Sequence, residues 1–287
     1  MRDVKVAAVQ FETTPDVNEN RRKALQFCEM AARDGAQAVC LPEFWMTGNP
    51  ITGELERLRP LAEPVPGPTF DLFCKKAREL GVYIVPGTIV ERGEDAHFYN
   101  TSGLIAPDGI LMARLRKDCP EQAAGKAEVE FGIRPGPGEY PVFDTAIGKV
   151  AVPIDVDVCA LEVPRIMGLK SAEILFWPMC WGAAVHDCVM PYGIAASSVS
   201  DAYVVVANRV GPAPWLRLGG SGIIWLRDYV ARVPNLMEGV AVATLDLDAV
   251  KARRVECQTR YPYWRRPSTY QLLLDDDAER KVRGRLG

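Results

Sequence analysis

The chain has 287 residues, of which 48% are hydrophobic and 25% charged, and its net charge at pH 7 is −3. This length and composition are typical of one large domain with a substantial core. Acidic and basic residues are interspersed, without the basic patch that nucleic-acid binding requires, and no apolar run approaches the roughly 18 residues that span a bilayer. We therefore expect a soluble, cytoplasmic protein that binds neither nucleic acid nor membrane.

Alternating strands and helices are predicted for the first part of the chain. Apolar runs predict the strands, and apolar residues at helical spacing predict helices that end at Asp34-Gly35 and at Gly81. The expected strands cover residues 4–11, 38–41 and 82–90, and the expected helices cover residues 18–33 and 68–80. This alternation favours a layered α/β fold.

A hairpin and a buried strand are predicted for the middle of the chain. Pro107-Asp108-Gly109 has the composition of a turn between two strands, and Lys117 directly follows the second of them. A β-branched run later in the chain predicts a buried strand that ends at Asp155. In chain order these features are strands at residues 99–105 and 110–116, a loop at residues 118–138 that is expected to cover the candidate site defined below, and a strand at residues 148–154.

The rest of the chain predicts further α/β structure and a tail. We expect strands at residues 174–177 and 202–208, helices at residues 164–168, 191–200 and 246–254, and a final strand pair at residues 222–226 and 239–245. The chain has no internal repeat and no linker, so residues 1–287 are predicted to form a single domain. The C-terminal tail, about residues 261–287, has no core of its own and is expected to pack on a partner subunit.

The eight cysteines and two histidines do not form a metal motif. No two cysteines have CxxC spacing, which argues against a zinc site and a disulfide framework and favours reduced thiols. We expect no metal and no cofactor.

Three polar residues, Glu43, Lys117 and Asp155, follow three separate predicted strands. A carboxylate at the end of a buried strand costs several kcal/mol unless it is paired or faces a cleft. Ligands in open α/β folds bind at the carboxyl ends of strands. These three residues are therefore the candidate site.

The chain resembles the nitrilase (carbon–nitrogen hydrolase) superfamily over roughly residues 4–270. The stretches that carry the resemblance are Leu41-Pro42-Glu43-Phe44 with Thr47-Gly48, Asn100-Thr101 through Asp108-Gly109 to Arg116-Lys117, then Asp157 with Glu162 and Arg165, Ala207-Asn208-Arg209-Val210-Gly211, and Arg266-Pro267 with Tyr270. The resemblance implies a four-layer α-β-β-α sandwich, a homodimer or higher homo-oligomer, and a small-molecule substrate.

The family's mechanism uses a cysteine thiolate, a glutamate base, and a lysine that stabilises the tetrahedral intermediate. On this resemblance Glu43 is the base and Lys117 the stabilising cation. A second glutamate of the family lies just before a Pro-Gly pair, and we assign it to Glu130, with Glu128 as the alternative. The family's substrate contacts fall near Cys180, and Trp181 is expected either to line the pocket or to belong to the core.

The sequence departs from the family at the nucleophile, where Asp155 occupies the position of the cysteine. Asp155 lies two residues before Asp157, as the family's cysteine does, whereas Cys159 lies four residues too late. A standard thiol amidase that uses Cys159 remains an alternative, but it requires a register shift that breaks the other matches. Asp157 is expected to accept hydrogen bonds from backbone amides.

An aspartate at this position changes the chemistry that the site can perform. It is ionised without help but is a poor nucleophile toward an amide. Beside Glu43 it forms a carboxyl pair in which one group holds a proton. With Lys117 these groups suit proton transfer or activation of a water. Glu43, Asp155 and Asp157 also suit a hard cation, but Lys117 argues against a metal.

The function expected from these residues is an enzyme that hydrolyses a non-peptide C–N bond, in an amide, carbamoyl compound or nitrile, by means of activated water. Two alternatives remain open. One is a non-hydrolytic lyase or decarboxylase that uses the same groups, and the other is a catalytically silent protein that binds a ligand or partner.

Overall fold

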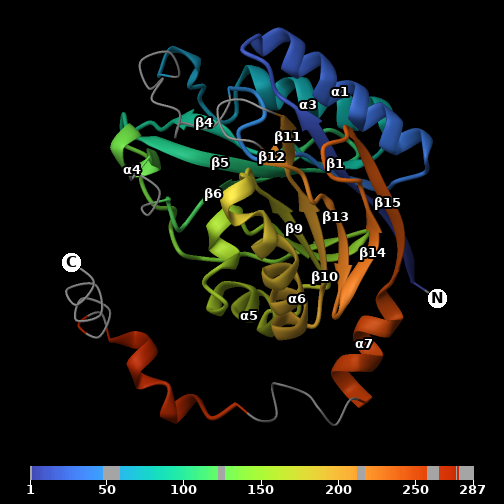
Figure 1. Ribbon diagram of the computed structural model, residues 1–287, viewed down its shortest axis with the longest axis vertical. Helices are drawn as coiled ribbons and strands as arrows, with labels where there is room; N and C mark the ends of the chain where they lie inside the picture. The colour runs from blue at the N-terminus through green and yellow to red at the C-terminus, as the bar shows by residue number, and fades with distance from the viewer. Residues whose placement is uncertain are drawn as a thin grey trace.

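The computed structural model describes residues 2–47, 59–121, 127–211, 217–256, 265–275 and 277. Within these ranges two β-sheets pack face to face, and helices cover the outer face of each sheet (Figure 1). The predicted four-layer α-β-β-α sandwich is confirmed.

One sheet contains nine strands in the described residues. Its path is β12-β11-β1-β2-β3-β5-β4, while β15 pairs with β1 and β6 pairs with β5. Its strands are β1 (Asp3–Glu12), β2 (Ala38–Cys40), β3 (Tyr83–Val85), β4 (Ile89–Arg92), β5 (Phe98–Ile105), β6 (Leu111–Arg116), β11 (Arg209–Gly211), β12 (Arg217–Leu218) and β15 (Gly239–Asp246). Strands β1, β2 and β3 are parallel, and β15 runs antiparallel to β1.

The second sheet contains six strands in the same ranges, in the order β14-β13-β10-β9-β8-β7. They are β7 (Phe143–Thr145), β8 (Gly148–Ala151), β9 (Ile174–Pro178), β10 (Tyr203–Ala207), β13 (Gly222–Trp225) and β14 (Asp228–Arg232). Because β8, β9 and β10 are parallel, their carboxyl ends meet at one edge of this sheet, where ligands bind in α/β folds.

Helices form the outer layers. Helices α1 (Val17–Arg33) and α3 (Pro68–Leu80) cover the nine-stranded sheet, and α5 (Glu162–Leu169) and α6 (Val189–Ser200) cover the six-stranded sheet. Asp16 caps α1 by accepting hydrogen bonds from the backbone N–H groups of Asn18 at 2.8 Å and Glu19 at 3.3 Å. The other helices of the described residues are α4 (Ala127–Phe131) and α7 (Leu247–Glu256), with short 3₁₀ turns η2 (Arg59–Leu61), η3 (Asp155–Val158), η4 (Ala183–Cys188), η5 (Pro267–Thr269) and η6 (Gln271–Leu274).

Successive side chains of a strand point to opposite faces of the sheet, so each strand contributes to two layers of the core. On β9, Ile174 and Phe176 lie between the two sheets, whereas Leu175 and Trp177 pack under α5 and α6. Both faces of the strand are therefore apolar, as expected for parallel strands covered on both sides.

Several predicted elements differ from the structure. The strand expected at residues 82–90 is two strands, because the chain turns at Gly87, where φ is +69° and a Cβ would lie 1.9 Å from the carbonyl oxygen of Pro42. The predicted pairing of residues 222–226 with 239–245 is wrong, since β13 pairs with β10 and β14 while β15 pairs with β1. The loop expected at residues 118–138 contains α4.

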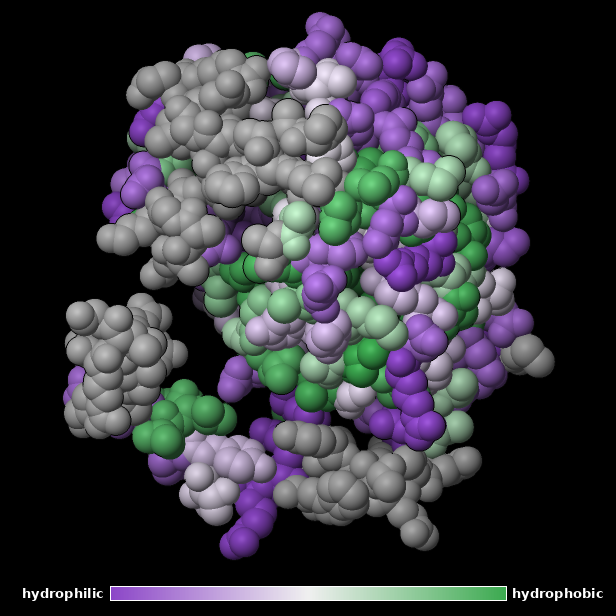
Figure 2. Space-filling model, in the orientation of Figure 1, coloured by the Kyte–Doolittle hydropathy of each residue, from purple (hydrophilic) through white to green (hydrophobic). Residues whose placement is uncertain are grey.

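The predicted tail lies partly outside the described residues. In its described part, η5 and η6 extend away from the two sheets (Figures 1 and 2). Leu272, Leu273 and Leu274 are exposed to 72%, 63% and 79%. Packing of this tail on a partner subunit remains a prediction. No helix among the described residues has the length and apolar character needed to cross a membrane.

Candidate active site

The three residues predicted from the strand ends meet in one buried cluster, and Glu128 joins them. The Nζ atom of Lys117 donates hydrogen bonds to Asp155 Oδ2 at 2.7 Å, to Glu128 Oε2 at 2.8 Å and to Glu43 Oε1 at 3.2 Å. The side chains of these residues are at most 6% exposed. An ammonium group has three N–H donors, so each donor of Lys117 has a carboxyl group as its partner.

The backbone brings these side chains together from both sheets. Glu43 follows β2, and its N–H group donates to the carbonyl oxygen of Met179 at 3.2 Å, at the end of β9. Lys117 follows β6, and Asp155 begins the 3₁₀ turn after β8. The site therefore lies where the two sheets are joined.

Asp155 has a strained backbone that its neighbours hold in place. Its φ is +49°, a conformation that costs a residue other than glycine about 1–3 kcal/mol. The indole Nε1 of Trp177 donates to the carbonyl oxygen of Asp155 at 2.8 Å. Strain of this kind concentrates at functional sites, and here it directs the Asp155 carboxyl group toward Lys117.

The second glutamate at Lys117 is Glu128, and the assignment to Glu130 is corrected. Both residues are on α4, but Glu128 is buried whereas Glu130 is exposed. Residues two apart on a helix point in nearly opposite directions, so only one of the pair can face Lys117. Glu128 also accepts a hydrogen bond from the backbone N–H of Glu121.

Asn100 is a site residue to which the sequence analysis assigned no role. Its Nδ2 atom donates to Glu43 Oε1 at 2.6 Å and to Glu128 Oε1 at 2.7 Å. Asn100 lies on β5, and its carbonyl oxygen accepts the N–H of Lys117 at 2.8 Å. The signal was present, because Asn100 begins the motif that leads to Lys117.

Burial and like charge perturb the ionisation of the cluster. Burial, followed by the charge of Asp155, raises the pKa of Glu43 to about 8, although Lys117 opposes this shift. Burial lowers the pKa of Lys117, but the charges of Asp155, Glu128 and Glu43 outweigh it and hold that pKa well above its ordinary value. At neutral pH, Glu43 is therefore protonated and Lys117 is charged.

Two carboxyl oxygens of the cluster have no partner within the described ranges. Asp155 Oδ1 and Glu43 Oε2 are both buried and form no hydrogen bond with the described residues. The Cys180 thiol lies beside Glu43, and its hydrogen bond lowers the pKa of that group. Buried polar atoms are nearly always paired, so two unpaired atoms in one cluster indicate a place for a ligand or water.

Asp157 does not belong to this cluster but supports the turn that carries Asp155. It accepts hydrogen bonds from the backbone N–H groups of Cys119 at 2.8 Å and Ile154 at 3.1 Å, the type of contact expected from the sequence. Burial raises the pKa of Asp157 to about 7.

Trp181 and Cys159 lie to one side of the cluster. Trp181 packs edge-on against Trp177 and Tyr192, which places it in the core under α6 as well as next to the turn of Asp155. Cys159 interacts with Tyr192, and burial followed by the charge of Asp155 raises the pKa of its thiol to about 12. A thiol in this state is a weak nucleophile.

Among the described residues, no three His, Cys, Asp or Glu side chains are arranged to hold a metal ion. The ammonium group of Lys117 occupies the centre of the carboxylate cluster, where a cation would otherwise bind.

The carbon–nitrogen hydrolase family model matches residues 5–255. The chain belongs to the carbon–nitrogen hydrolase family. N-carbamoylputrescine amidase of Solanum lycopersicum is 30% identical over 302 residues, with 98% of each chain covered. Omega-amidase NIT2-B of Xenopus laevis is 33% identical over 275 residues, which cover 91% of this chain and 95% of the amidase.

Solved structures of this family have the same fold. A carbon–nitrogen hydrolase from Helicobacter pylori G27 has a TM-score of 0.87 at 20% identity, with 96% of this chain and 99% of that chain covered. Yeast Nit3, a member of the nitrilase superfamily from Saccharomyces cerevisiae, has a TM-score of 0.80 at 22% identity, with 91% and 96% covered. The amidase relatives support carbon–nitrogen hydrolase chemistry for this family member.

Proposed function

We propose that this protein hydrolyses a non-peptide C–N bond of a small amide or carbamoyl compound, with water activated by Asp155 and Glu43 in place of a cysteine nucleophile. The observation that carries this proposal is the buried cluster around Lys117, in which one oxygen of Asp155 and one of Glu43 have no hydrogen-bond partner among the described residues. Both unpaired atoms belong to groups that can exchange protons with a substrate.

The two carboxyl groups suit opposite roles. Glu43, with a pKa of about 8, carries a proton at neutral pH and can donate it. Asp155 Oδ1 can accept one. An amide offers the complementary pair, since its N–H donates and its C=O accepts. The same division into acid and base is the basis of general acid–base catalysis.

The proton movements balance as follows. Water attacks the carbonyl carbon and gives one proton to Asp155. This addition produces a tetrahedral intermediate. Glu43 then gives its proton to the departing nitrogen, and the C–N bond breaks. In the tetrahedral intermediate, Asp155 is protonated and neutral, so its hydrogen bond with Lys117 is weaker. The N–H of Lys117 that is freed can then stabilise the oxyanion. Release of the acid product and transfer of a proton from Asp155 to Glu43 complete the cycle.

Ammonia release tests this proposal. Wild type, Asp155→Asn, Asp155→Ala and Asp155→Cys are compared on a panel of small amides, N-carbamoyl amino acids and nitriles. We expect wild type to turn over at least one compound, and both Asp155→Asn and Asp155→Ala to lose about 100-fold or more in kcat, as loss of a proton-transfer group typically causes. Cys159→Ala is the matched control and retains activity.

Two results would contradict the proposal. Loss of activity in Cys159→Ala, or inactivation by iodoacetamide that this variant escapes, would show a thiol mechanism. Ammonia release that appears only in Asp155→Cys would support a second candidate function, a catalytically silent binding protein. Saturation of all three Lys117 donors by carboxyl groups favours that second candidate, because Lys117 has no donor left for an oxyanion until Asp155 changes its charge.

A further inference from the structure

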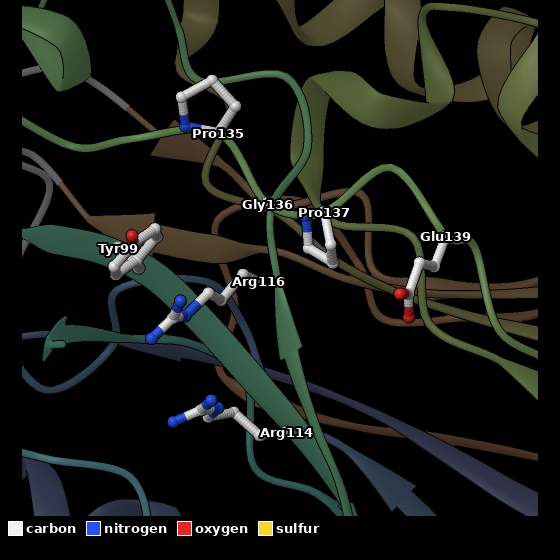
Figure 3. Close-up of a pocket in the computed structure, with 7 residues that line it drawn as sticks. All are labelled: Tyr99, Arg114, Arg116, Pro135, Gly136, Pro137 and Glu139. Carbon is white, nitrogen blue, oxygen red and sulfur yellow. The ribbon is translucent and has the colours of Figure 1, made fainter. Parts of the chain in front are cut away.

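A cavity of about 470 Å³ lies beside β5 and β6, apart from the candidate active site. Its walls come from Tyr99 of β5, Arg114 and Arg116 of β6, and the segment from Pro135 to Glu139 (Figure 3). We propose that this cavity binds a small amino-acid-like zwitterion, with its carboxylate on Arg114 and its ammonium group on Glu139. The inference goes beyond the proposed hydrolysis and does not depend on it.

The cavity uses the reverse face of the strands that carry the active-site cluster. Successive residues of a strand point to opposite faces. Leu115 packs between the two sheets, and Lys117 continues that face, so Arg114 and Arg116 point to the other side. A ligand of this cavity is therefore separated by the sheet from Lys117 and is not the substrate of that cluster.

Arg116 and Tyr99 form one side of the cavity, and the polar groups of both side chains already have partners. Arg116 donates to both oxygens of the buried Glu91, at 3.0 and 2.7 Å, and its guanidinium group lies 3.5 Å from the centre of the Tyr99 ring. The Tyr99 hydroxyl donates to Asp95 at 2.6 Å. This bidentate pair with a stacked ring holds Arg116 in one orientation.

Arg114 is the cation that remains available. Its side chain is 40% exposed, and only Nη1 makes contacts, at 3.3 Å to Glu91 and 3.4 Å to the carbonyl oxygen of Val65. Arg116 already binds both oxygens of Glu91, so this single carboxylate faces two guanidinium groups. In the described part of the chain, Nε and Nη2 of Arg114 have no hydrogen-bond partner. Such a planar pair of donors matches a carboxylate.

The residues of the opposite wall indicate which second charged group the ligand has. Pro135 and Pro137 have no N–H group, and the N–H of Gly136 donates to the carbonyl oxygen of Lys117 at 2.8 Å. The wall therefore offers an anion no backbone donor at these three positions. It presents instead the exposed carboxylate of Glu139, which repels phosphate or a dicarboxylate and attracts an ammonium group.

Calorimetric titration of the full chain with unbranched ω-amino acids, from glycine to 6-aminohexanoate, tests the proposal. These probes carry the two charges at increasing separation. Butyrate, butylamine and inorganic phosphate serve as probes with one kind of charge. We expect at least one ω-amino acid to bind, and its Kd to weaken about tenfold or more in both Arg114→Gln and Glu139→Gln. Arg92→Gln, an exposed arginine outside the cavity lining, is the matched control and binds as wild type does.

Three results would overturn the inference. One is the absence of binding across the whole series. Another is binding of butyrate or phosphate as tight as that of the best ω-amino acid, with no effect of Glu139→Gln, which would indicate a simple anion site. The third is an equal loss of binding in Arg92→Gln, which would place the ligand elsewhere. Circular dichroism of each variant confirms that it is folded.

Discussion

Glu43 makes the stability of the protein depend on pH. Its pKa of about 8 in the folded protein exceeds the roughly 4.3 of a free glutamate, so the folded state retains a proton that the unfolded chain releases. The stability from this retained proton is complete below about pH 4 and is lost as the pH rises toward about 8. We therefore expect the fall in Tm between about pH 5 and about pH 8 to be smaller in Glu43→Gln than in wild type.

Thermal melts across this pH range measure the effect, and Glu130→Gln is the control. Glu130 is an exposed glutamate on α4, so its replacement leaves the pH dependence as it is in wild type. Asp157, whose pKa is also raised, contributes equally to all three proteins and does not alter the comparison. A Glu43→Gln variant with the full pH dependence of wild type would mean that Glu43 is ionised in the folded protein at neutral pH.

At the scale of elements, β9 determines the conformation of the turn that carries Asp155. The Trp177 indole N–H donates to the carbonyl oxygen of Asp155, and Trp177→Phe retains an aromatic ring but removes this buried hydrogen bond. We expect the free energy of unfolding to fall by about 1–3 kcal/mol and ammonia release to fall with it. Urea denaturation measures the first effect, and Trp181→Phe, which replaces another buried tryptophan of the same apolar cluster, is the control. Equal stability of the two variants would assign no role to this hydrogen bond.

Local patterns predicted most elements because their causes are local. The helix ends at Asp34-Gly35 and at Gly81 and the turn at Asp108-Gly109 depend on residues a few positions away. Pairing depends on distant residues, and for that reason β13 and β15 were assigned to each other although they belong to different sheets.

The candidate site was predictable to a similar extent. Strand ends indicated Glu43, Lys117 and Asp155, and the structure brings them together. The choice between Glu128 and Glu130 required the orientation of a five-residue helix, which spacing from a Pro-Gly pair does not provide. Asn100 begins the motif that leads to Lys117, but the motif alone did not give its role, because the carboxyl groups that it binds come from two other segments.

At the scale of the whole molecule, the layer between the two sheets holds the sandwich together. Phe176 is fully buried in this layer, and Phe176→Ala leaves a cavity that neighbouring strands cannot fill. We expect the free energy of unfolding to fall by about 3–5 kcal/mol, measured by urea denaturation. Leu273→Ala, at an exposed position in η6, should stay within about 0.5 kcal/mol of wild type in the monomer. A loss of the same size in both variants would contradict this account of the core.

The ladder between β1 and β15 has a consequence for synthesis on the ribosome. β1 can pair with β2 over three residues soon after both are made, but its eight paired residues in β15 come near the end of the described chain. Contacts between such distant segments form slowly. Until translation reaches β15, one edge of an apolar strand is open to pairing with other nascent chains. We therefore expect truncation before residue 239 to convert a folding chain into an aggregating one.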